Sequence, residues 1–316
     1  MKVLANDGIS AGGKKTLEEA GFEVITIKVA QEQLANYLRE NKIDAIVVRS
    51  ATKVRKDLIN ACPDLKVIGR AGVGMDNIDV KYAREKGLYV FNTPSASSSS
   101  VAELVFAHLF GAVRFLHAAN RNMPLEGDSR FKELKKNYSG GRELRGKTIG
   151  IIGFGRIGRE VAKIALGIGM KVIASDREEG EAEITLEFYN HQEIKIPIKT
   201  EPVEDLIKHS DFITIHVPAQ DEPVLGRDEI QNMKNGVGLI NTSRGGLIDE
   251  VALVEALDSG KVAFAALDTF KNEPSPAIKI LMNGKISLSP HIGAATGEAQ
   301  DRIGVELADE IINALK

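Results

Sequence analysis

Short Val- and Ile-rich runs alternate with amphipathic stretches along most of the 316-residue chain, and this alternation restricts the fold more than any other feature. In the first part we expect strands in "FEVITIKV", "DAIVVRS", "LKVIGRAG" and "LYVFNTP", and helices in "KKTLEEAG", "QEQLANYLREN" and "KVRKDLINAC". Strands that alternate with helices in this way are typical of parallel sheets covered on both faces.

The alternation restarts after "RGK" with strands expected in "TIGIIGFG", "KVIASD", "DFITIHVP", "GVGLINTS", "VAFAALDTF" and "KISLSPHIG". Between the two parts, Pro94 and a run of serines lead into a predicted long helix of residues 98–120. A polar connection with little helix or strand signal follows it. The sequence therefore predicts an α/β protein with two doubly wound parallel-sheet domains.

Charge and composition exclude several classes of protein. The net charge of −3 gives no overall field that attracts nucleic acid or an acidic membrane surface, so we expect neither partner. Cys62 is the only cysteine, which excludes an internal disulfide and suits a reducing, cytoplasmic location. The most apolar stretch, Val101 to Asn120, is interrupted by charged residues and reads as a helix buried against protein. We predict no metal site.

A glycine motif indicates a dinucleotide cofactor. Gly153, Gly155 and Gly158 form a G-x-G-x-x-G pattern that follows an apolar strand and opens a helix. Asp176 ends the next strand about 20 residues on, where a carboxylate binds the ribose hydroxyls of NAD and repels the 2′-phosphate of NADP. The neighbouring Arg177 would soften this preference. The alternative is that these glycines serve only a tight turn and that Asp176 is a solvated loop residue.

Arg244 lies where the strand "GVGLINTS" ends, followed by two glycines. Ligands of open α/β sheets bind beyond the carboxyl ends of the strands, and a guanidinium binds a carboxylate through two hydrogen bonds. The alternative is a structural arginine paired with Asp249 or Asp268. On the sequence alone, both interpretations of Arg244 remain open.

Two later strands also end in residues that can carry charge. "VAFAALDTFKNEP" ends in Asp268 and then Glu273, and "KISLSPHIG" ends in His291 within a Pro-His-x-Gly turn. A histidine takes up and releases a proton near neutral pH, so His291 suits the oxidation of a hydroxyl-bearing carbon. Glu273 would favour the imidazolium and fix the ring. The other histidines are expected to be packed or surface residues.

These motifs together resemble one enzyme family. "GFGRIG", "NTSRGGLIDE", "DTFKNEP" and "SPHIGA" are similar to the D-isomer-specific 2-hydroxyacid dehydrogenases over nearly the whole chain. The resemblance implies that Arg244, Glu273 and His291 are the catalytic residues and that NAD is the cofactor. It also implies a discontinuous, flavodoxin-like substrate domain of residues 1–96 and 292–316. Residues 97–291 would form the Rossmann NAD-binding domain, with the 98–120 helix in a homodimer.

The expected cofactor contacts lie at the ends of the strands of the second part. They are Gly153, Gly155, Arg156, Ile157, Gly158, Asp176, Val217, Pro218, Thr242, Ser243, Arg244, Asp268, His291, Gly293 and Ala294.

Within the family, "VVRSATKV", "VIGRAGVGMDNIDV" and "FNTPSASSSSVAEL" resemble the phosphoglycerate dehydrogenases. This resemblance implies oxidation of 3-phospho-D-glycerate, with the substrate carboxylate bound by Ser50, Gly72, Val73 and Gly74. Arg49 and Arg70 each follow a predicted strand, and paired arginines suit a phosphate dianion. The alternative is two surface arginines with acidic partners. Lys135 or Lys136 is a further phosphate candidate, reaching across a dimer.

Three departures from the family pattern bear on these expectations. Residues 177–200 are longer and more strand-like than expected, which affects the adenine side of the cofactor pocket. Asn272 replaces a second acid beside Glu273. The sequence ends at Lys316, so we expect no C-terminal regulatory domain. A reductase of hydroxypyruvate or glyoxylate remains an alternative function, and an NAD-sensing corepressor a more distant one.

Overall fold

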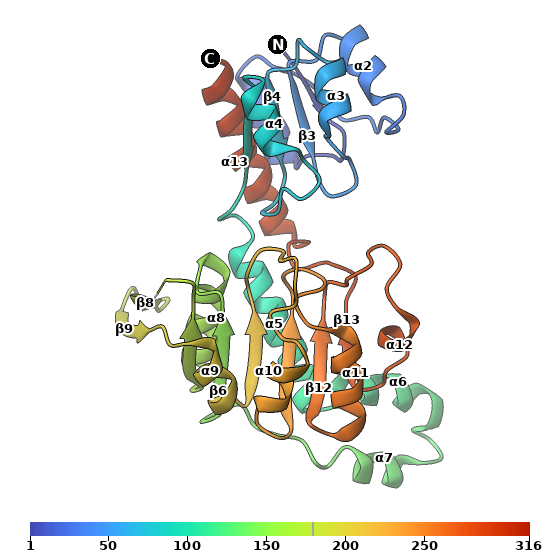
Figure 1. The fold of residues 1–316 in the computed structure, drawn as a ribbon, viewed down its shortest axis with the longest axis vertical. Coiled ribbons are helices and arrows are strands. Elements are labelled where there is room, and N and C mark those ends of the chain that lie inside the picture. Colours follow the sequence, from blue (N-terminus) through green and yellow to red (C-terminus); the bar gives the residue numbers. More distant parts are fainter. Residues whose placement is uncertain (179) are drawn as a thin grey trace. The chain divides into compact units, whose positions relative to one another are not determined.

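The computed structural model describes residues 1–178 and 180–316, so Glu179 of the 177–200 segment lies outside the described residues. The chain divides into two compact units (Figure 1). The first consists of Met1–Ser100 and Ala294–Lys316, and the second of Val101–Gly293. The expected domain limits, after residues 96 and 291, lie a few residues before these boundaries.

The first unit is a five-stranded parallel sheet of order β2-β1-β3-β4-β5, the flavodoxin-like arrangement. Its strands are β1 (Lys2–Ala5), β2 (Glu23–Ile25), β3 (Ala45–Val48), β4 (Val67–Arg70) and β5 (Tyr89–Asn92). Its helices are α1 (Ala11–Glu19), α2 (Leu34–Glu40), α3 (Lys56–Ala61), α4 (Val80–Glu85) and α13 (Gly297–Leu315).

Helix α13 brings the end of the chain back onto the first unit. It packs on α1 so closely that a Cβ on Gly13 would lie 2.4 Å from the backbone of Gly304. Ile303, Leu307 and Ile311 of α13 are buried in one apolar cluster with Val3 and Val67 of the sheet. The amphipathic pattern of α13 thus buries one helix face against strands from the start of the chain.

The second unit contains a six-stranded parallel sheet of order β13-β12-β11-β10-β6-β7. Its strands are β6 (Thr148–Ile152), β7 (Lys171–Ser175), β10 (Phe212–Ile215), β11 (Val237–Asn241), β12 (Val262–Leu267) and β13 (Ile286–Leu288). Its helices are α5 (Ser98–Val113), α6 (Leu116–Glu126), α7 (Phe131–Asn137), α8 (Arg156–Gly167), α9 (Val203–His209), α10 (Arg227–Asn232), α11 (Glu250–Ser259) and α12 (Ile278–Leu281). One buried cluster joins the sheet to α5 and α8, and a second joins it to α9, α10, α11 and α12. The predicted α/β class is confirmed.

The 177–200 segment forms an antiparallel hairpin, β8 (Glu181–Glu187) and β9 (Glu193–Lys199). Among the residues that the structure describes in this segment, a single parallel bridge, between Ala174 and Thr200, lies beside β7, where a Rossmann sheet usually has a further strand. Ala182, Ile184 and Ile198 of the hairpin are buried in the cluster that includes α8. The hairpin therefore covers the helix that follows the glycine motif.

Two expectations for the region after Pro94 are wrong. The predicted helix of residues 98–120 breaks after Val113, because Phe115 has the left-handed φ of 55°. The amide of Arg142 donates to the Val113 carbonyl at 2.9 Å, taking the acceptor that a continuous helix would use. The connection expected to lack helix instead contains the end of α6 and all of α7.

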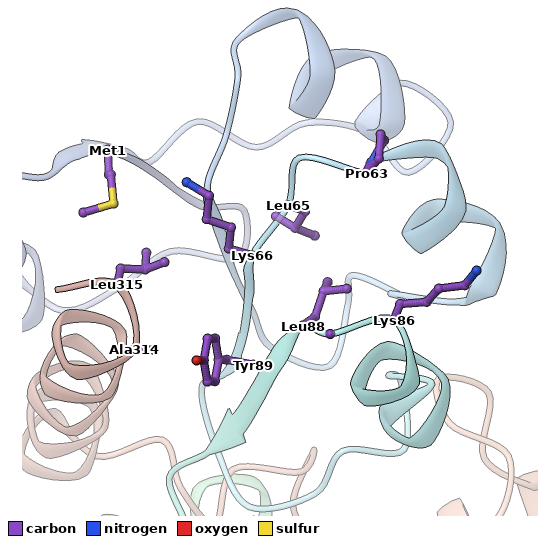
Figure 2. Close-up of a pocket in the computed structure, with 10 residues that line it drawn as sticks. Met1, Pro63, Leu65, Lys66, Lys86, Leu88, Tyr89, Ala314 and Leu315 are labelled. Atoms are coloured by element: carbon purple, nitrogen blue, oxygen red, sulfur yellow. The ribbon is translucent and has the colours of Figure 1, made fainter.

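Within the described residues, no single helix is long and apolar enough to cross a membrane, and α5 with α6 reaches that length only as a pair bent by 56°. A shallow pocket of about 460 Å³ lies at the amino ends of β4 and β5 in the first unit (Figure 2). Lys66, Lys86 and Tyr89 line it together with Leu315 of α13. It is at the edge of the sheet opposite to the loops that follow β3 and β4.

Candidate active site

The glycine motif adopts the geometry that a dinucleotide needs. Gly153 has a φ of +91°, and a Cβ there would lie 2.5 Å from the carbonyl oxygen of His216. A Cβ on Gly158 would lie 2.2 Å from the carbonyl oxygen of Gly153, so α8 packs directly on the turn. A Cβ on Gly155 would meet no atom within 4 Å. The first and third glycines are thus required by packing, while the second leaves open space for a pyrophosphate.

Asp176 supports this turn from the end of β7. Its Oδ2 accepts a hydrogen bond from the Phe154 amide at 2.7 Å, and its Oδ1 accepts one from the Arg177 amide at 2.7 Å. The Arg177 guanidinium donates to Oε1 of Gln220 at 3.3 Å. The exposed Asp176 carboxylate therefore stands directly beside the glycine turn, and each oxygen keeps a lone pair for a ribose hydroxyl.

Three neighbouring strands end in buried polar atoms that lack a partner within the described chain. They are Nδ1 of His216 after β10, Oγ1 of Thr242 after β11 and Oγ1 of Thr269 after β12. Burial lowers the pKa of His216 to about 3, so this imidazole is neutral. Buried polar groups are rarely left unpaired in folded proteins. These atoms, the open space at Gly155 and the helix that begins at Arg156 fit a bound dinucleotide.

Several other expected cofactor contacts lie at the same edge of the second unit. Ser243 ties two of the loops together, because its hydroxyl donates to the Val217 carbonyl at 2.7 Å. Pro218 follows in the loop after β10, and Ile157 lies in the first turn of α8. Ala294 belongs to the first unit, where its carbonyl accepts a hydrogen bond from the Gln300 side chain at 2.7 Å.

His291 and Glu273 are in direct contact. Nδ1 of His291 lies 2.8 Å from Oε2 of Glu273, and the other carboxylate oxygen accepts the Phe270 amide at 2.9 Å. Because a carboxylate only accepts, Nδ1 carries the proton and Nε2 is the nitrogen left for a substrate. Both side chains are partly exposed, 44% for His291 and 37% for Glu273. The pair can therefore exchange protons with a bound molecule.

Asp268 shapes the turn that carries His291. Its buried carboxylate accepts the Ser289 hydroxyl at 2.6 Å, the Ile292 amide at 2.8 Å and the Gly293 amide at 2.9 Å. Its backbone carbonyl accepts the His291 amide at 2.8 Å. His291 has a φ of 55°, a conformation uncommon for a residue with a side chain, and these hydrogen bonds hold it.

The loop after β11 carries Arg244 and is held by hydrogen bonds of Asn241 and by contact with the loop after β12. Nδ2 of Asn241 donates to the Arg244 carbonyl at 2.7 Å, and the Asn241 carbonyl accepts the Asp268 amide at 3.0 Å. A Cβ on Gly245 would lie 1.9 Å from the Phe270 carbonyl oxygen, so this loop touches the backbone of the next one. One chain of contacts thus joins the Arg244 loop, Asp268 and the His291 turn.

The two acids considered as structural partners of Arg244 have other contacts. Asp249 caps α11, since its Oδ1 accepts the amides of Val251 and Ala252 at 2.9 and 3.1 Å. Asp268 is engaged with the His291 turn as described. The Arg244 guanidinium itself donates to the Ser243 carbonyl at 2.7 Å.

The expected substrate residues follow β3 and β4 at the carboxyl edge of the first sheet. Val48 and Arg70 are register partners, so Arg49 and Arg70 leave adjacent strands at nearly the same level. Gly72 has a φ of +136°, and a Cβ there would lie 2.6 Å from Nη1 of Arg70. Arg70 donates to the Ala71 carbonyl, so its guanidinium folds back over its own loop.

The remaining residues of these loops are accessible. Ser50 and Val73 are exposed and Gly74 is half-buried. Lys135 and Lys136 are exposed in the last turn of α7, which Figure 1 shows beyond the amino ends of the strands of its own unit. Within the second unit, these two lysines therefore do not lie beside the residues that end the strands.

Sequence reasoning missed residues that act through hydrogen bonds rather than through exposed charge. His108 of α5 lies 2.8 Å from the hydroxyls of both Ser287 and Ser289, and the latter bonds Asp268. Asp7 follows β1 and binds the loop after β3. A pair of polar residues that follows a buried strand, Asn6 and Asp7, was the signal available for Asp7. Nothing in the sequence pairs His108 with the distant serines.

Comparison with known proteins identifies the family. Residues 106–293 match the sequence profile of the D-isomer specific 2-hydroxyacid dehydrogenase NAD binding domain. The chain belongs to this family. It is 42% identical to a hydroxypyruvate reductase of Thermotoga maritima over 99% of this chain and 98% of that protein. It is 40% identical to a D-3-phosphoglycerate dehydrogenase of Methanocaldococcus jannaschii, covering all of this chain but 58% of that protein.

Solved structures agree with this assignment. A glyoxylate reductase from Paecilomyes thermophila superimposes with a TM-score of 0.83 and 28% identity, over 100% of this chain and 95% of the other. The predicted two-domain Rossmann arrangement, the NAD cofactor and the class of NAD-dependent D-2-hydroxyacid dehydrogenases are confirmed by these relatives. The chain spans little more than half the length of the phosphoglycerate dehydrogenases that it matches.

Proposed function

We propose that this dehydrogenase oxidises 3-phospho-D-glycerate to 3-phosphooxypyruvate, the entry to serine biosynthesis. The observation that carries the chemistry is the 2.8 Å contact between His291 and Glu273 at the carboxyl edge of the NAD-binding sheet. In this proposal His291 is the general acid–base, Glu273 supports it, and Arg244 binds the substrate carboxylate and polarises the oxygen that becomes the carbonyl. The product of oxidation at this carbon is a 2-keto acid.

The proton follows a defined path. In oxidation, Nε2 of His291 takes the hydroxyl proton, and the imidazolium formed is stabilised by the Glu273 carboxylate on Nδ1. Bound NAD supplies the hydride acceptor for the same carbon. In the reverse direction, His291 returns the proton to the alkoxide oxygen. Proton transfer by a positioned side chain contributes typically about 10²–10⁴-fold in rate.

The choice of a phosphorylated substrate rests on the first unit. Within the part of the chain that the structure describes, Arg49 forms no ion pair, and its Nε is buried without a partner. A buried guanidinium nitrogen without an acceptor is costly, and a phosphate oxygen would relieve that cost. Arg49 is therefore the primary candidate for phosphate binding, with Arg70 as its neighbour. Ser50 and the 72–74 backbone are proposed to bind the carboxylate.

A second candidate is the reduction of hydroxypyruvate or glyoxylate. The Thermotoga maritima relative named a hydroxypyruvate reductase matches over nearly its entire length, whereas the phosphoglycerate dehydrogenases extend well beyond the matched part. Arg70 favours this candidate too, because its bond to the Ala71 carbonyl already uses part of its guanidinium. A reductase would employ the same His291 and Glu273 pair as the proton donor.

Initial rates separate the two candidates. We expect a higher kcat/KM for 3-phospho-D-glycerate with NAD than for D-glycerate, and Arg49→Gln should remove most of that difference while leaving D-glycerate turnover nearly unchanged. Equal or better turnover of D-glycerate, with rapid NADH-dependent reduction of hydroxypyruvate, would instead establish the reductase.

We also propose that the protein is a cytoplasmic homodimer assembled through α5, α6 and α7. Helix α6 has no buried residue, and its apolar side chains Leu116 and Leu125 are 64% and 74% exposed. Phe110 of α5 and Phe131 of α7 add to this apolar surface. Such a surface is typical of a protein–protein interface. Light scattering should give twice the chain mass, and Leu125→Glu should shift it to the monomer.

A further inference from the structure

Asp7 lies at the topological switch point of the first sheet. It is the second residue after β1, which pairs with β2 on one side and β3 on the other, and its side chain is only 5% exposed. Ligands of open α/β sheets bind where the strand order reverses, beyond the carboxyl ends of the strands. A buried carboxylate at this position requires an explanation, because a charge removed from water is costly unless it is paired.

The Asp7 carboxylate binds the loop of residues 49–52, which follows β3. Oδ2 accepts the Arg49 amide at 2.7 Å and the Thr52 amide at 3.1 Å, and Oδ1 accepts the Thr52 hydroxyl at 2.9 Å. The ammonium of Lys28 also contacts Oδ1. Asn77 closes the loop from the other side by donating to the carbonyls of Arg49 and Thr52 at 2.7 and 2.6 Å.

These contacts keep Asp7 ionised. Burial alone would raise the pKa of the Asp7 carboxyl, but the hydrogen bonds from Lys28, Arg49 and Thr52 outweigh burial and lower it. The Lys28 ammonium neutralises the carboxylate charge. Asp7 therefore organises the loop without leaving a net negative charge that would repel an anion.

The loop held in this way presents hydrogen-bond donors and a cation. Its outer amides, of Arg49 and Thr52, are bound to Asp7, whereas those of Ser50 and Ala51 have no acceptor among residues 1–178 and 180–316. Both of these residues are exposed. The Arg49 side chain leaves the same loop. Two adjacent unpaired amides beside a guanidinium form a concentration of positive potential suited to an anion.

We propose that Asp7 is a positioning residue for the substrate anion: it fixes the 49–52 loop so that the Ser50 and Ala51 amides and the Arg49 guanidinium face the acid groups of the substrate. The inference rests on the proposed role of this loop in binding the 2-hydroxy acid. Asp7 itself touches neither substrate nor cofactor. Its loss would therefore weaken substrate binding and leave the nucleotide site of the second unit intact.

The test compares Asp7→Asn with Asp44→Asn in the full-length protein. Asp44 is a matched control in the same unit, since it accepts the Lys2 amide at 2.8 Å and the Lys66 ammonium at 2.7 Å. Hydrogen bonds with these donors likewise outweigh burial and lower its pKa. Asp44 precedes β3, so it lies at the amino edge of the sheet, away from the 49–52 loop.

Asp7→Asn removes the charge and replaces one accepting oxygen by an NH2 donor. Either the two loop amides on Oδ2 or the Lys28 ammonium and Thr52 hydroxyl on Oδ1 therefore lose their acceptor, and the 49–52 loop is held less tightly. We expect KM for the 2-hydroxy acid to rise about tenfold or more, as for the loss of a charge-assisted hydrogen bond, with kcat within about twofold of wild type. NADH binding, followed by fluorescence, should be unchanged. Hydrogen exchange at the Arg49 and Thr52 amides should accelerate in Asp7→Asn and stay at the wild-type rate in Asp44→Asn.

Equal KM values and equal loop exchange in the two variants would overturn the positioning role. If wild type turns over no 2-hydroxy acid, the proposed function fails, whereas the exchange comparison still reports on the loop. If Asp7→Asn does not fold, Thr52→Val takes its place, because it removes one donor to Asp7 and keeps the charge pair. That variant should raise KM and leave NADH affinity at the wild-type value, and an unchanged KM would refute the inference.

Discussion

Gly245 is the residue whose substitution most directly tests how the active-site loops are held. A Cβ at this position would lie 1.9 Å from the Phe270 carbonyl oxygen, 2.0 Å from its carbon and 2.6 Å from the Lys271 amide nitrogen. Ordinary contacts of a Cβ begin at 3.4 Å, so Gly245→Ala must separate the two loops by roughly 1.5 Å, a large shift for a packed backbone.

That separation has two calculable consequences. The Phe270 amide, which holds Glu273 at 2.9 Å, moves with its loop, and a misplacement of about 1 Å in a catalytic group costs on the order of 10²-fold in rate. Forcing a methyl group into a packed site also destabilises the fold by about 1–3 kcal/mol. We therefore expect Gly245→Ala to lose both activity and stability.

The assay is kcat/KM for 3-phospho-D-glycerate at saturating NAD, together with denaturant unfolding. Gly167→Ala is the control, because a Cβ at the end of α8 meets no atom within 4 Å, and alanine there should stabilise by about 0.5–1 kcal/mol. Wild-type rates and wild-type stability for Gly245→Ala would refute the account of loop contact.

Three further predictions concern single groups of the site. Glu273→Gln should lower kcat by about 10²-fold with unchanged NADH affinity, because the ring loses its charged support; stopped-flow rates and a fluorescence titration check this. Gly155→Ala should weaken NADH binding at least tenfold without loss of melting temperature, since its Cβ would enter only the open space expected for the pyrophosphate. Burial depresses the pKa of His216 to about 3, so its contribution to stability is complete above the unfolded value of 6.5 and is lost as the pH falls below it. As the pH falls below 6.5, the unfolding free energy of the wild type should decrease by up to about 1.4 kcal/mol per pH unit for each buried histidine. In His216→Gln this decrease should be smaller by the contribution of one histidine.

The sequence by itself determined the fold class and predicted the sheet edges at which the site residues would lie. Alternating Val- and Ile-rich runs require parallel sheets, and polar residues directly after buried strands all reach one edge of their sheet. Arg244, Asp268 and His291, which follow the ends of β11, β12 and β13, were predicted as site residues in this way, because a strand end is a local feature. The motif glycines were also visible, since a turn from strand to helix is encoded within a few neighbouring residues.

The tertiary structure alone decided which of these polar groups meet. Glu273 and His291 are far apart in sequence, and only the adjacency of β12 and β13 brings them to 2.8 Å. The break at Phe115 has no local signal, because the helix acceptor there is taken by Arg142 from a later segment. Asp7 likewise has a role only through a loop that follows a different strand. Contacts between distant segments depend on strand order, and strand order is fixed by packing of the whole sheet rather than by any short stretch of the chain.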